Sequence, residues 1–113
     1  MAVAERSKTE RIRELNDVFR QSFIGGRVML TAGVDGLADD VKAKVLQAVR
    51  TFDAFDSGND PHHEHDFLSV EVDGERFFAK FDYYDNDLKY GSEDPSDPEQ
   101  TIRVLTIMRA DEY

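Results

Sequence analysis

The dipeptide Asp73-Gly74 constrains the fold of this chain more than any other feature of its sequence. It lies between two segments rich in β-branched and aromatic residues, FLSVEV at 67–72 and ERFFAKFDYY at 75–84. A two-residue Asp-Gly link is typical of a type I′ turn, in which both central residues take positive φ. The sequence therefore predicts an antiparallel hairpin in which Val72 faces Glu75.

This turn also fixes the register, because each step back along the first strand meets one step forward along the second. One face of the hairpin then carries only residues typical of a core: Leu68, Val70, Val72, Phe77, Ala79 and Phe81. The other face pairs Glu71 with Arg76, Ser69 with Phe78, Phe67 with Lys80, His65 with Asp82 and, if the ladder reaches that far, His63 with Tyr84. Favourable opposed pairs stabilise a sheet by about 0.2–1 kcal/mol each, so the side chains agree with this register.

The segment NDPHHEHDF at 59–67 is the densest run of side chains that could bind a metal or take part in catalysis. The predicted hairpin divides these side chains between its two faces. On one face, His63 and His65 of this segment lie near Asp82 of the second strand, and this set resembles the three-ligand arrangement that zinc or iron binds, so the three residues are candidate metal ligands. The simpler alternative is that His65 only pairs with Asp82 across the strands.

The opposite face of the same segment carries His62, Glu64 and Asp66. Glu64 and Asp66 are the candidate catalytic bases of a metal-dependent reaction, although regular alternation points both away from the ion. In the simpler alternative, His62 and His63 are solvated loop residues. No cofactor other than a divalent metal is suggested by any motif.

The rest of the chain predicts two helices and two more strands. Apolar residues three or four apart predict helices over 7–23, ended by Gly25-Gly26, and over 37–52. RVMLTAGV predicts a short strand from residue 27, and TIRVLTIM, apolar on both faces, predicts a central strand. Residues 85–100 are expected to form a long polar loop.

These elements predict an α+β fold in the order α-β-α-β-β-β, with a four-stranded, mostly antiparallel sheet and two helices packed on one face. The 113 residues fit a single globular domain, 1–113, in which residues 1–6 are expected to be disordered. The chain has no cysteine, no run of about 18 apolar residues and no signal peptide at its N-terminus, so a cytoplasmic protein with no membrane contact is expected.

The net charge of −10 is concentrated in residues 53–99, where fifteen Asp and Glu stand against three Lys and Arg. Such a segment repels phosphate, which disfavours direct nucleic-acid binding, and attracts a basic protein surface. Phe67 and Phe78 lie on the face with the charged pairs, where an exposed aromatic pair marks an interface. Either the protein's own elements cover them or a second chain does, as in a homodimer. The predicted interaction surface comprises Phe67, Phe78, Tyr84, Asp85 and Asp87.

The strings NDPHHEHDF, KFDYYD, SEDPSDP and TIRVLTIMRADEY resemble a small, mainly alphaproteobacterial family known as domain of unknown function 3768. The resemblance extends from IRELNDVFRQSFIGGRVMLTAGV to Tyr113, and Leu68 and Phe78 are the two positions that depart from the family's pattern. The family has no assigned activity, so the resemblance implies a shared domain and no roles for individual residues.

Two classes of function follow from these observations. The leading interpretation is a non-enzymatic binding module that presents an acidic surface to a basic protein partner, and its narrower form is a DNA mimic that occupies a nucleic-acid-binding protein. The alternative is a metal-dependent hydrolase in which His63, His65 and Asp82 hold the ion.

Overall fold

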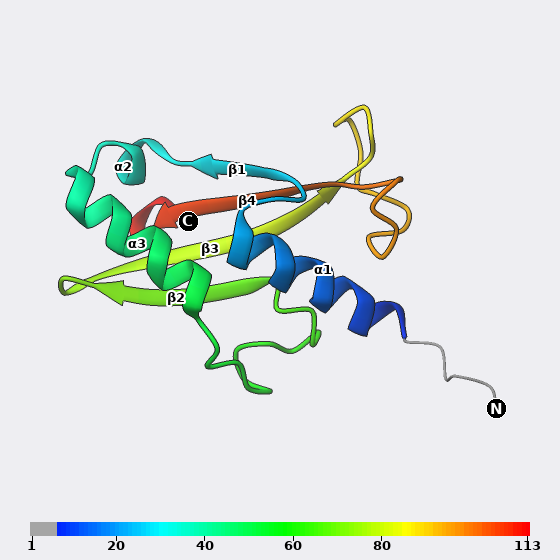
Figure 1. The fold of residues 1–113 in the computed structure, drawn as a ribbon, viewed down its shortest axis with the longest axis horizontal. Coiled ribbons are helices and arrows are strands. Elements are labelled where there is room, and N and C mark those ends of the chain that lie inside the picture. Colours follow the sequence, from blue (N-terminus) through cyan, green and yellow to red (C-terminus); the bar gives the residue numbers. More distant parts are fainter. Residues whose placement is uncertain (1–6) are drawn as a thin grey trace.

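The computed structural model describes residues 7–113, so the predicted disorder of residues 1–6 lies outside the described part of the chain. Figure 1 shows one mixed sheet with two long helices on the same face. The strands, in the spatial order β1-β4-β3-β2, are β1 (Arg27–Leu30), β2 (Phe67–Val72), β3 (Glu75–Tyr84) and β4 (Ile102–Arg109). The helical elements are α1 (Lys8–Ser22), α2 (Ala32–Asp35), α3 (Asp39–Thr51) and the 3-10 turn η1 (Ala110–Glu112). The predicted α+β class and the face shared by the two long helices are confirmed.

The hairpin of β2 and β3 has the predicted register along its whole ladder, from Val72 opposite Glu75 to Phe67 opposite Lys80. Asp73 and Gly74 take φ values of 51° and 80°, the positive values that a type I′ turn requires. The β3 strand pairs antiparallel with β4, whereas β1 pairs parallel with β4. The strand predicted to be central, β4, therefore has a neighbour on each side.

The core lies between the sheet and the two long helices. Phe19 of α1, Val45 and Val49 of α3, and Phe77 and Ile107 of the sheet are each at most 1% exposed. Phe19 meets Phe81 edge to face, with ring centroids 6.0 Å apart. Burial of such side chains stabilises a fold by about 1.5–3 kcal/mol each, so this layer anchors both helices.

The predicted strand over 27–34 is wrong after Leu30. The chain turns at Thr31 into the short helix α2, which sends Val34 into the core with no exposed surface. Glu112 holds this turn, because its carboxylate accepts hydrogen bonds from the Thr31 hydroxyl at 2.7 Å and from the Gly33 amide at 3.0 Å. A Cβ atom at Gly33 would lie only 2.5 Å from this carboxylate, so a larger residue would displace the Glu112 side chain from the turn.

The helix α1 begins one residue after the predicted start and ends before the predicted glycine pair. The hydroxyl of Ser7 accepts a hydrogen bond from the Glu10 amide, as an N-cap does. At the other end, Phe23 takes the left-handed conformation, two residues before the expected Gly25.

Within residues 7–113, no helix has the length and apolar character needed to cross a membrane.

Candidate functional site

Two loops, 53–66 and 85–100, each contact the N-terminal half of α1 at one end of the molecule, although Figure 1 shows them apart from one another. Arginine side chains of the helix hold both loops by donating hydrogen bonds to main-chain carbonyl groups of the loops. Arg13 donates a hydrogen bond to the carbonyl oxygen of His63 at 3.2 Å, and Arg11 donates one to that of Ser96 at 2.8 Å. This end of the molecule also contains all three histidines and is the candidate functional site.

His65 is fixed by contacts within this end of the molecule and does not face Asp82. Its Nδ1 atom lies 3.0 Å from both carboxylate oxygens of Asp17, and its Nε2 atom lies 3.5 Å from Oδ2 of the buried Asp60. The imidazole ring also stacks on Phe55, with centroids 3.7 Å apart and planes 4° from parallel. Both ring nitrogens therefore have carboxylate partners, and His65 fastens loop 53–66 to α1.

The predicted pairing of His65 with Asp82 is wrong because the strand stops at Phe67. His63 and His65 have φ values of 59° and 53°, which a strand does not accommodate, so regular alternation ends before them. Only one further ladder contact forms, in which the Phe81 amide donates to the carbonyl of Asp66. Asp82 instead pairs with Lys80 at 2.9 Å, so the predicted pair of His63 with Tyr84 is also absent from the ladder.

The three predicted metal ligands, His63, His65 and Asp82, are thus not brought together. The part of the chain that the structure describes contains no group of three His, Asp or Glu side chains arranged to hold an ion. The predicted ligand set is therefore wrong, and the hydrolase interpretation loses the geometry on which it depended.

A buried polar network, absent from the sequence-based prediction, lies next to His65. Asn16 has no exposed surface, and its amide nitrogen donates to the hydroxyl of Tyr83 at 2.8 Å and to the carbonyl of Glu64 at 3.0 Å. The Asn16 oxygen accepts from Nε of the buried Arg103 at 3.0 Å. Glu64, a predicted catalytic base, accepts from the Tyr83 hydroxyl at 2.9 Å. Every member therefore has a partner, as the stability of buried polar groups requires.

The burial of Tyr83 predicts a loss of stability at alkaline pH. Burial raises the pKa of its hydroxyl well above the usual value, and the Glu64 carboxylate raises the pKa further. A group with a raised folded-state pKa contributes its full stability below the unfolded value of about 10 and loses it as pH rises toward the folded value. We expect the free energy of unfolding to fall above about pH 10, by up to about 1.4 kcal/mol per pH unit from this residue. Urea unfolding of Tyr83→Phe should show a shallower fall over pH 9–11, and equal slopes for both proteins would contradict this role.

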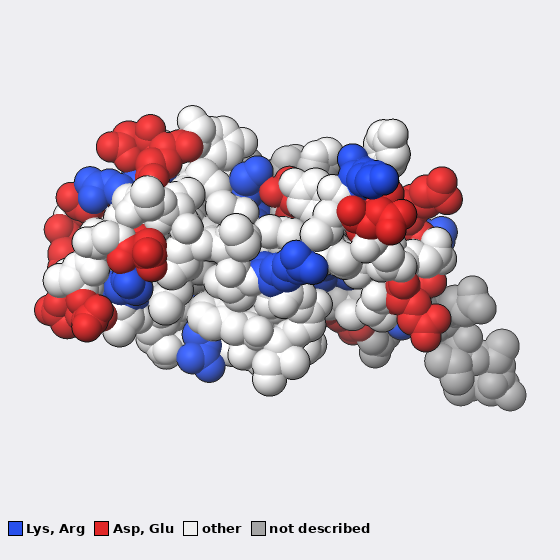
Figure 2. Space-filling view, turned by 90° about the horizontal axis from the view of Figure 1, so that it is seen from above, with Lys and Arg blue, Asp and Glu red and all other residues white. Residues whose placement is uncertain are grey.

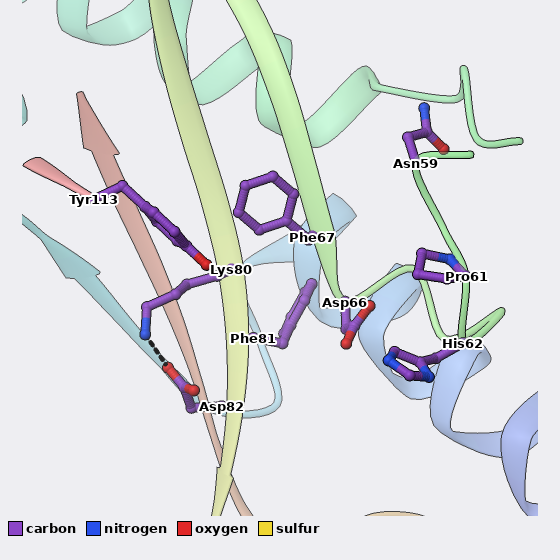
Figure 3. A pocket seen from close by; sticks show the side chains of 9 residues that line it. All are labelled: Asn59, Pro61, His62, Asp66, Phe67, Lys80, Phe81, Asp82 and Tyr113. Atoms are coloured by element: carbon purple, nitrogen blue, oxygen red, sulfur yellow. Dashed lines mark ion pairs between the residues drawn. The ribbon is translucent and has the colours of Figure 1, made fainter. Parts of the chain in front are cut away.

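A pocket of about 420 Å³ opens between loop 53–66 and the sheet face that carries no long helix. Figure 3 shows His62 and Asp66, a predicted catalytic base, on one side, and the ion pair of Lys80 and Asp82 on the other. Phe67 lies between these two sides, and Tyr113 lies beside Lys80. The pocket thus combines charged side chains of both signs with aromatic rings.

The same sheet face carries an aromatic cluster of Phe67, Phe78 and Tyr113. Their ring centroids lie 5.2–5.8 Å apart, and Tyr113 meets both phenylalanines edge to face. The protein's own C-terminal turn therefore covers part of the predicted aromatic pair, although Tyr113 itself is 76% exposed. Alternation along β3 places Tyr84 on this face too. Asp85 and Asp87 follow it in loop 85–100, where Asp85 accepts a hydrogen bond from the Lys89 amide.

The carboxylates of the candidate site differ in how far they are neutralised. Loops 53–66 and 85–100 contain eleven Asp and Glu against one lysine, Lys89. Asp17, Asp60 and Asp94 have cationic or imidazole partners. In contrast, the exposed side chains of Asp87, Glu93 and Glu99 have no hydrogen-bond or ion-pair partner within residues 7–113.

Asn16, Asp17 and Arg103 are the site residues that the sequence analysis missed. Asn16 lies one turn after Ile12 and one turn before Phe19 and Arg20 on the buried side of α1. A polar residue on the apolar stripe of a helix indicates a buried hydrogen-bonding group, and this signal was available in the sequence. Arg103 is a similar case, since it alternates with Leu105 and Ile107 on the core face of β4.

Comparison with known proteins places the chain in a family but gives it no function. No curated protein and no solved structure matches the chain. One family model does match the chain, over a region that begins at the last residue of β1. Helix α1 therefore lies before the matched region, which is shorter than the part of the chain over which the sequence resembles the family. The sequence model of the family described as "Protein of unknown function (DUF3768)" matches residues 30–112, and the chain therefore belongs to this family.

Proposed function

We propose that the protein is a non-enzymatic binding module that uses loop 85–100 to bind a basic segment of a protein partner. The observation that carries this proposal is the set of exposed carboxylates of Asp87, Glu93 and Glu99, which have no partner within residues 7–113. Unpaired surface carboxylates attract cationic side chains and speed their association.

The arginines near this end hold main-chain oxygens and leave these carboxylates unneutralised. Arg11 and Arg13 bind the two loops through carbonyl groups, and Arg103 donates to the carbonyl of Pro95. These contacts fix the shape of the loops without pairing the outer carboxylates. The loops are therefore ordered and charged, and a partner would not have to displace an internal ion pair.

The acidic residues at the opposite end of the molecule are partly compensated by a lysine and by a helix N-terminus, although Asp39 and Asp40 also have no side-chain hydrogen-bond or ion-pair partner within residues 7–113. Figure 2 shows carboxylates gathered at both ends of this view, over α2 and the start of α3 as well as over loop 85–100. Asp35 pairs with Lys42 at 3.4 Å, and Asp39 and Asp40 lie in the first turn of α3, where the helix dipole favours negative charge. This difference favours loop 85–100 as the binding end.

Loop 85–100 has the internal hydrogen bonds needed to present its charges in a fixed arrangement. Asp94 accepts a hydrogen bond from the Ser96 hydroxyl, which lowers the pKa of this carboxyl. The Thr101 hydroxyl donates to the carbonyl of Asp94 at 2.8 Å, and the Asp97 carboxylate accepts from the amide of Glu99 at 2.9 Å. A preorganised loop loses less conformational entropy on binding.

The test uses a fluorescent twelve-residue peptide of alternating lysine and arginine, with a glycine-serine peptide of equal length for comparison. We expect the basic peptide to bind at low ionic strength and to weaken strongly in high salt, because screening removes attraction between exposed charges. The triple variant Asp87→Asn, Glu93→Gln, Glu99→Gln should bind about ten-fold more weakly, which corresponds to about 0.5 kcal/mol for each exposed ion pair. Fluorescence anisotropy measures both effects.

The matched control is Asp35→Asn, Asp39→Asn, Asp40→Asn, which removes the same charge from the opposite end of the molecule. We expect this variant to keep most of the peptide affinity, and NMR shifts caused by the peptide should concentrate in residues 85–100. Equal weakening in both triple variants would show that only net charge matters, and the proposal would then be wrong. The DNA-mimicking form of this function stays a prediction, because it adds the requirement that the partner binds DNA.

A further inference from the structure

We propose that the pocket of about 420 Å³ between loop 53–66 and the sheet binds a small primary amine with an aromatic body, whose ammonium group pairs with the Asp66 carboxylate. This site is separate from the proposed peptide-binding loop. Its lining residues come from residues 59–67, from β3 and from the C-terminus, and none comes from residues 85–100. The inference therefore does not depend on the proposed function.

Within the described chain, the Asp66 carboxylate lies in this pocket without a partner. Its side chain is half-buried and makes no hydrogen bond or ion pair within residues 7–113, while the carbonyl of the same residue is fixed by a hydrogen bond from the Phe81 amide at 2.9 Å. The exposed imidazole of His62 lies on the same side of the pocket and can accept a second hydrogen bond when neutral (Figure 3). A partly buried carboxylate attracts a cation more strongly than an exposed one, because water screens it less.

The lysine and the second carboxylate of the pocket cancel one another. Lys80 pairs with Asp82 at 2.9 Å, and this hydrogen bond raises the pKa of the lysine. Lys80 therefore keeps its positive charge at neutral pH and neutralises Asp82. Among the carboxylates and the lysine that line the pocket, the charge of Asp66 is left over, so the pocket favours a cation over an anion.

Aromatic side chains form much of the remaining lining and fit an aromatic ligand body. Figure 3 shows the ring of Phe67 between the side with Asp66 and the side with Lys80, and the ring of Tyr113 beside Lys80. Phe67 is half-buried and Tyr113 is 76% exposed, so both rings have surface that a ligand can cover. Aromatic pairs are stabilised by ring geometry as well as by burial. The volume of the pocket lies in the range of about 300–1,000 Å³ that is usual for small-ligand sites.

The test is an NMR titration of the isotope-labelled protein with phenethylamine and no peptide, which isolates this site from the proposed binding loop. We expect a dissociation constant of about 1 mM, with amide shifts concentrated at residues 59–67 and 80–82. The anion 3-phenylpropionate has a similar body and should bind at least ten-fold more weakly. Butylamine, which resembles a lysine side chain and has no ring, should bind at least five-fold more weakly.

The variant Asp66→Asn should weaken phenethylamine binding about ten-fold, because it removes the charge and keeps the size of the side chain. The carboxylate has no hydrogen bond or ion pair within residues 7–113 to lose, so the fold should be retained. The matched control is Asp73→Asn, which removes one charge at the other end of the same hairpin. Asn-Gly also suits a type I′ turn, so this variant keeps the hairpin and should bind phenethylamine as the wild type does.

Reversal of the pocket's charge tests which groups select the ligand. In the double variant Asp66→Asn, Asp82→Asn, Lys80 loses its partner and the pocket becomes positive, so 3-phenylpropionate should bind more tightly than phenethylamine. A wild-type protein whose amides do not shift at 20 mM phenethylamine would overturn the proposal. So would equal weakening by Asp66→Asn and Asp73→Asn, butylamine binding as tight as that of phenethylamine, or a double variant that still prefers the amine.

Discussion

Replacement of Phe19 by alanine is expected to lower the free energy of unfolding by about 4 kcal/mol, the middle of the usual range for a buried phenylalanine. Phe19 is 1% exposed and connects α1 with Phe81 of the sheet. It also packs under the chain that enters β1, since a Cβ atom at Gly26 would lie 2.7 Å from its ring. Removal of the ring therefore leaves a cavity at the junction of a helix and two strands. Urea unfolding followed by circular dichroism measures the change.

The neighbouring Val18 provides the matched control for this prediction. It lies in the same helix but is 62% exposed, so Val18→Ala should change the free energy of unfolding by no more than about 0.5 kcal/mol. Equal and small effects in the two variants would show that α1 is not packed against the sheet. The free energy of unfolding of a domain is typically about 5–15 kcal/mol, so the Phe19 variant should lose a substantial part of its free energy of unfolding.

The elements whose signals are local could be predicted from the sequence. The Asp73-Gly74 turn requires positive φ at both residues, and the alternation of apolar residues fixes which face is buried, so all six pairs from Phe67–Lys80 to Val72–Glu75 were predictable. Helices α1 and α3 follow from apolar spacing in the same way. None of these inferences requires knowledge of a distant contact.

The elements that depend on distant contacts could not be predicted in this way. The turn of α2 is held by Glu112, which lies 79 positions from Gly33 in the sequence. Similarly, the conformation of His65 depends on Asp17, which lies 48 positions away on α1. Alternation extrapolated from the hairpin places His65 opposite Asp82, but the contact with α1 gives the loop a better partner and ends the strand at Phe67.

The pairing of charged side chains is another feature that the sequence predicts only in part. Acidic residues lie beside the arginines of α1 in the sequence, and such spacing favours ion pairs along the helix. In the structure Arg20 pairs with Asp17, but Arg11 and Arg13 donate to the carbonyls of loops that lie far away in the sequence. The sequence therefore indicates how many charges are present, while the fold decides which carboxylates have no partner.

Replacement of Asn16 by alanine should lower the free energy of unfolding by about 3 kcal/mol, although the residue is neutral and its side chain is small. The change removes the acceptor for Nε of Arg103, which is buried, and the donor for the hydroxyl of Tyr83, which is partly buried. A buried group that loses its hydrogen-bond partner costs about 1–3 kcal/mol, and more when it is charged. Urea unfolding measures the change, and Gln21→Ala on the exposed side of α1 is the matched control, with an expected change below about 0.5 kcal/mol.

A double-mutant cycle separates the cost of an unpaired guanidinium from the cost of lost packing. Arg103 also donates to the carbonyl of Pro95, so Arg103→Met should be destabilising by itself. Once this cation is absent, Asn16→Leu leaves no buried charge without a partner, and the double variant should be more stable than the sum of the single effects by at least about 1 kcal/mol. Additive effects would mean that Asn16 contributes through packing alone. A favourable coupling would show that α1, β4 and loop 85–100 are held together by one polar network, which connects the stability of the fold to the shape of the proposed binding loop.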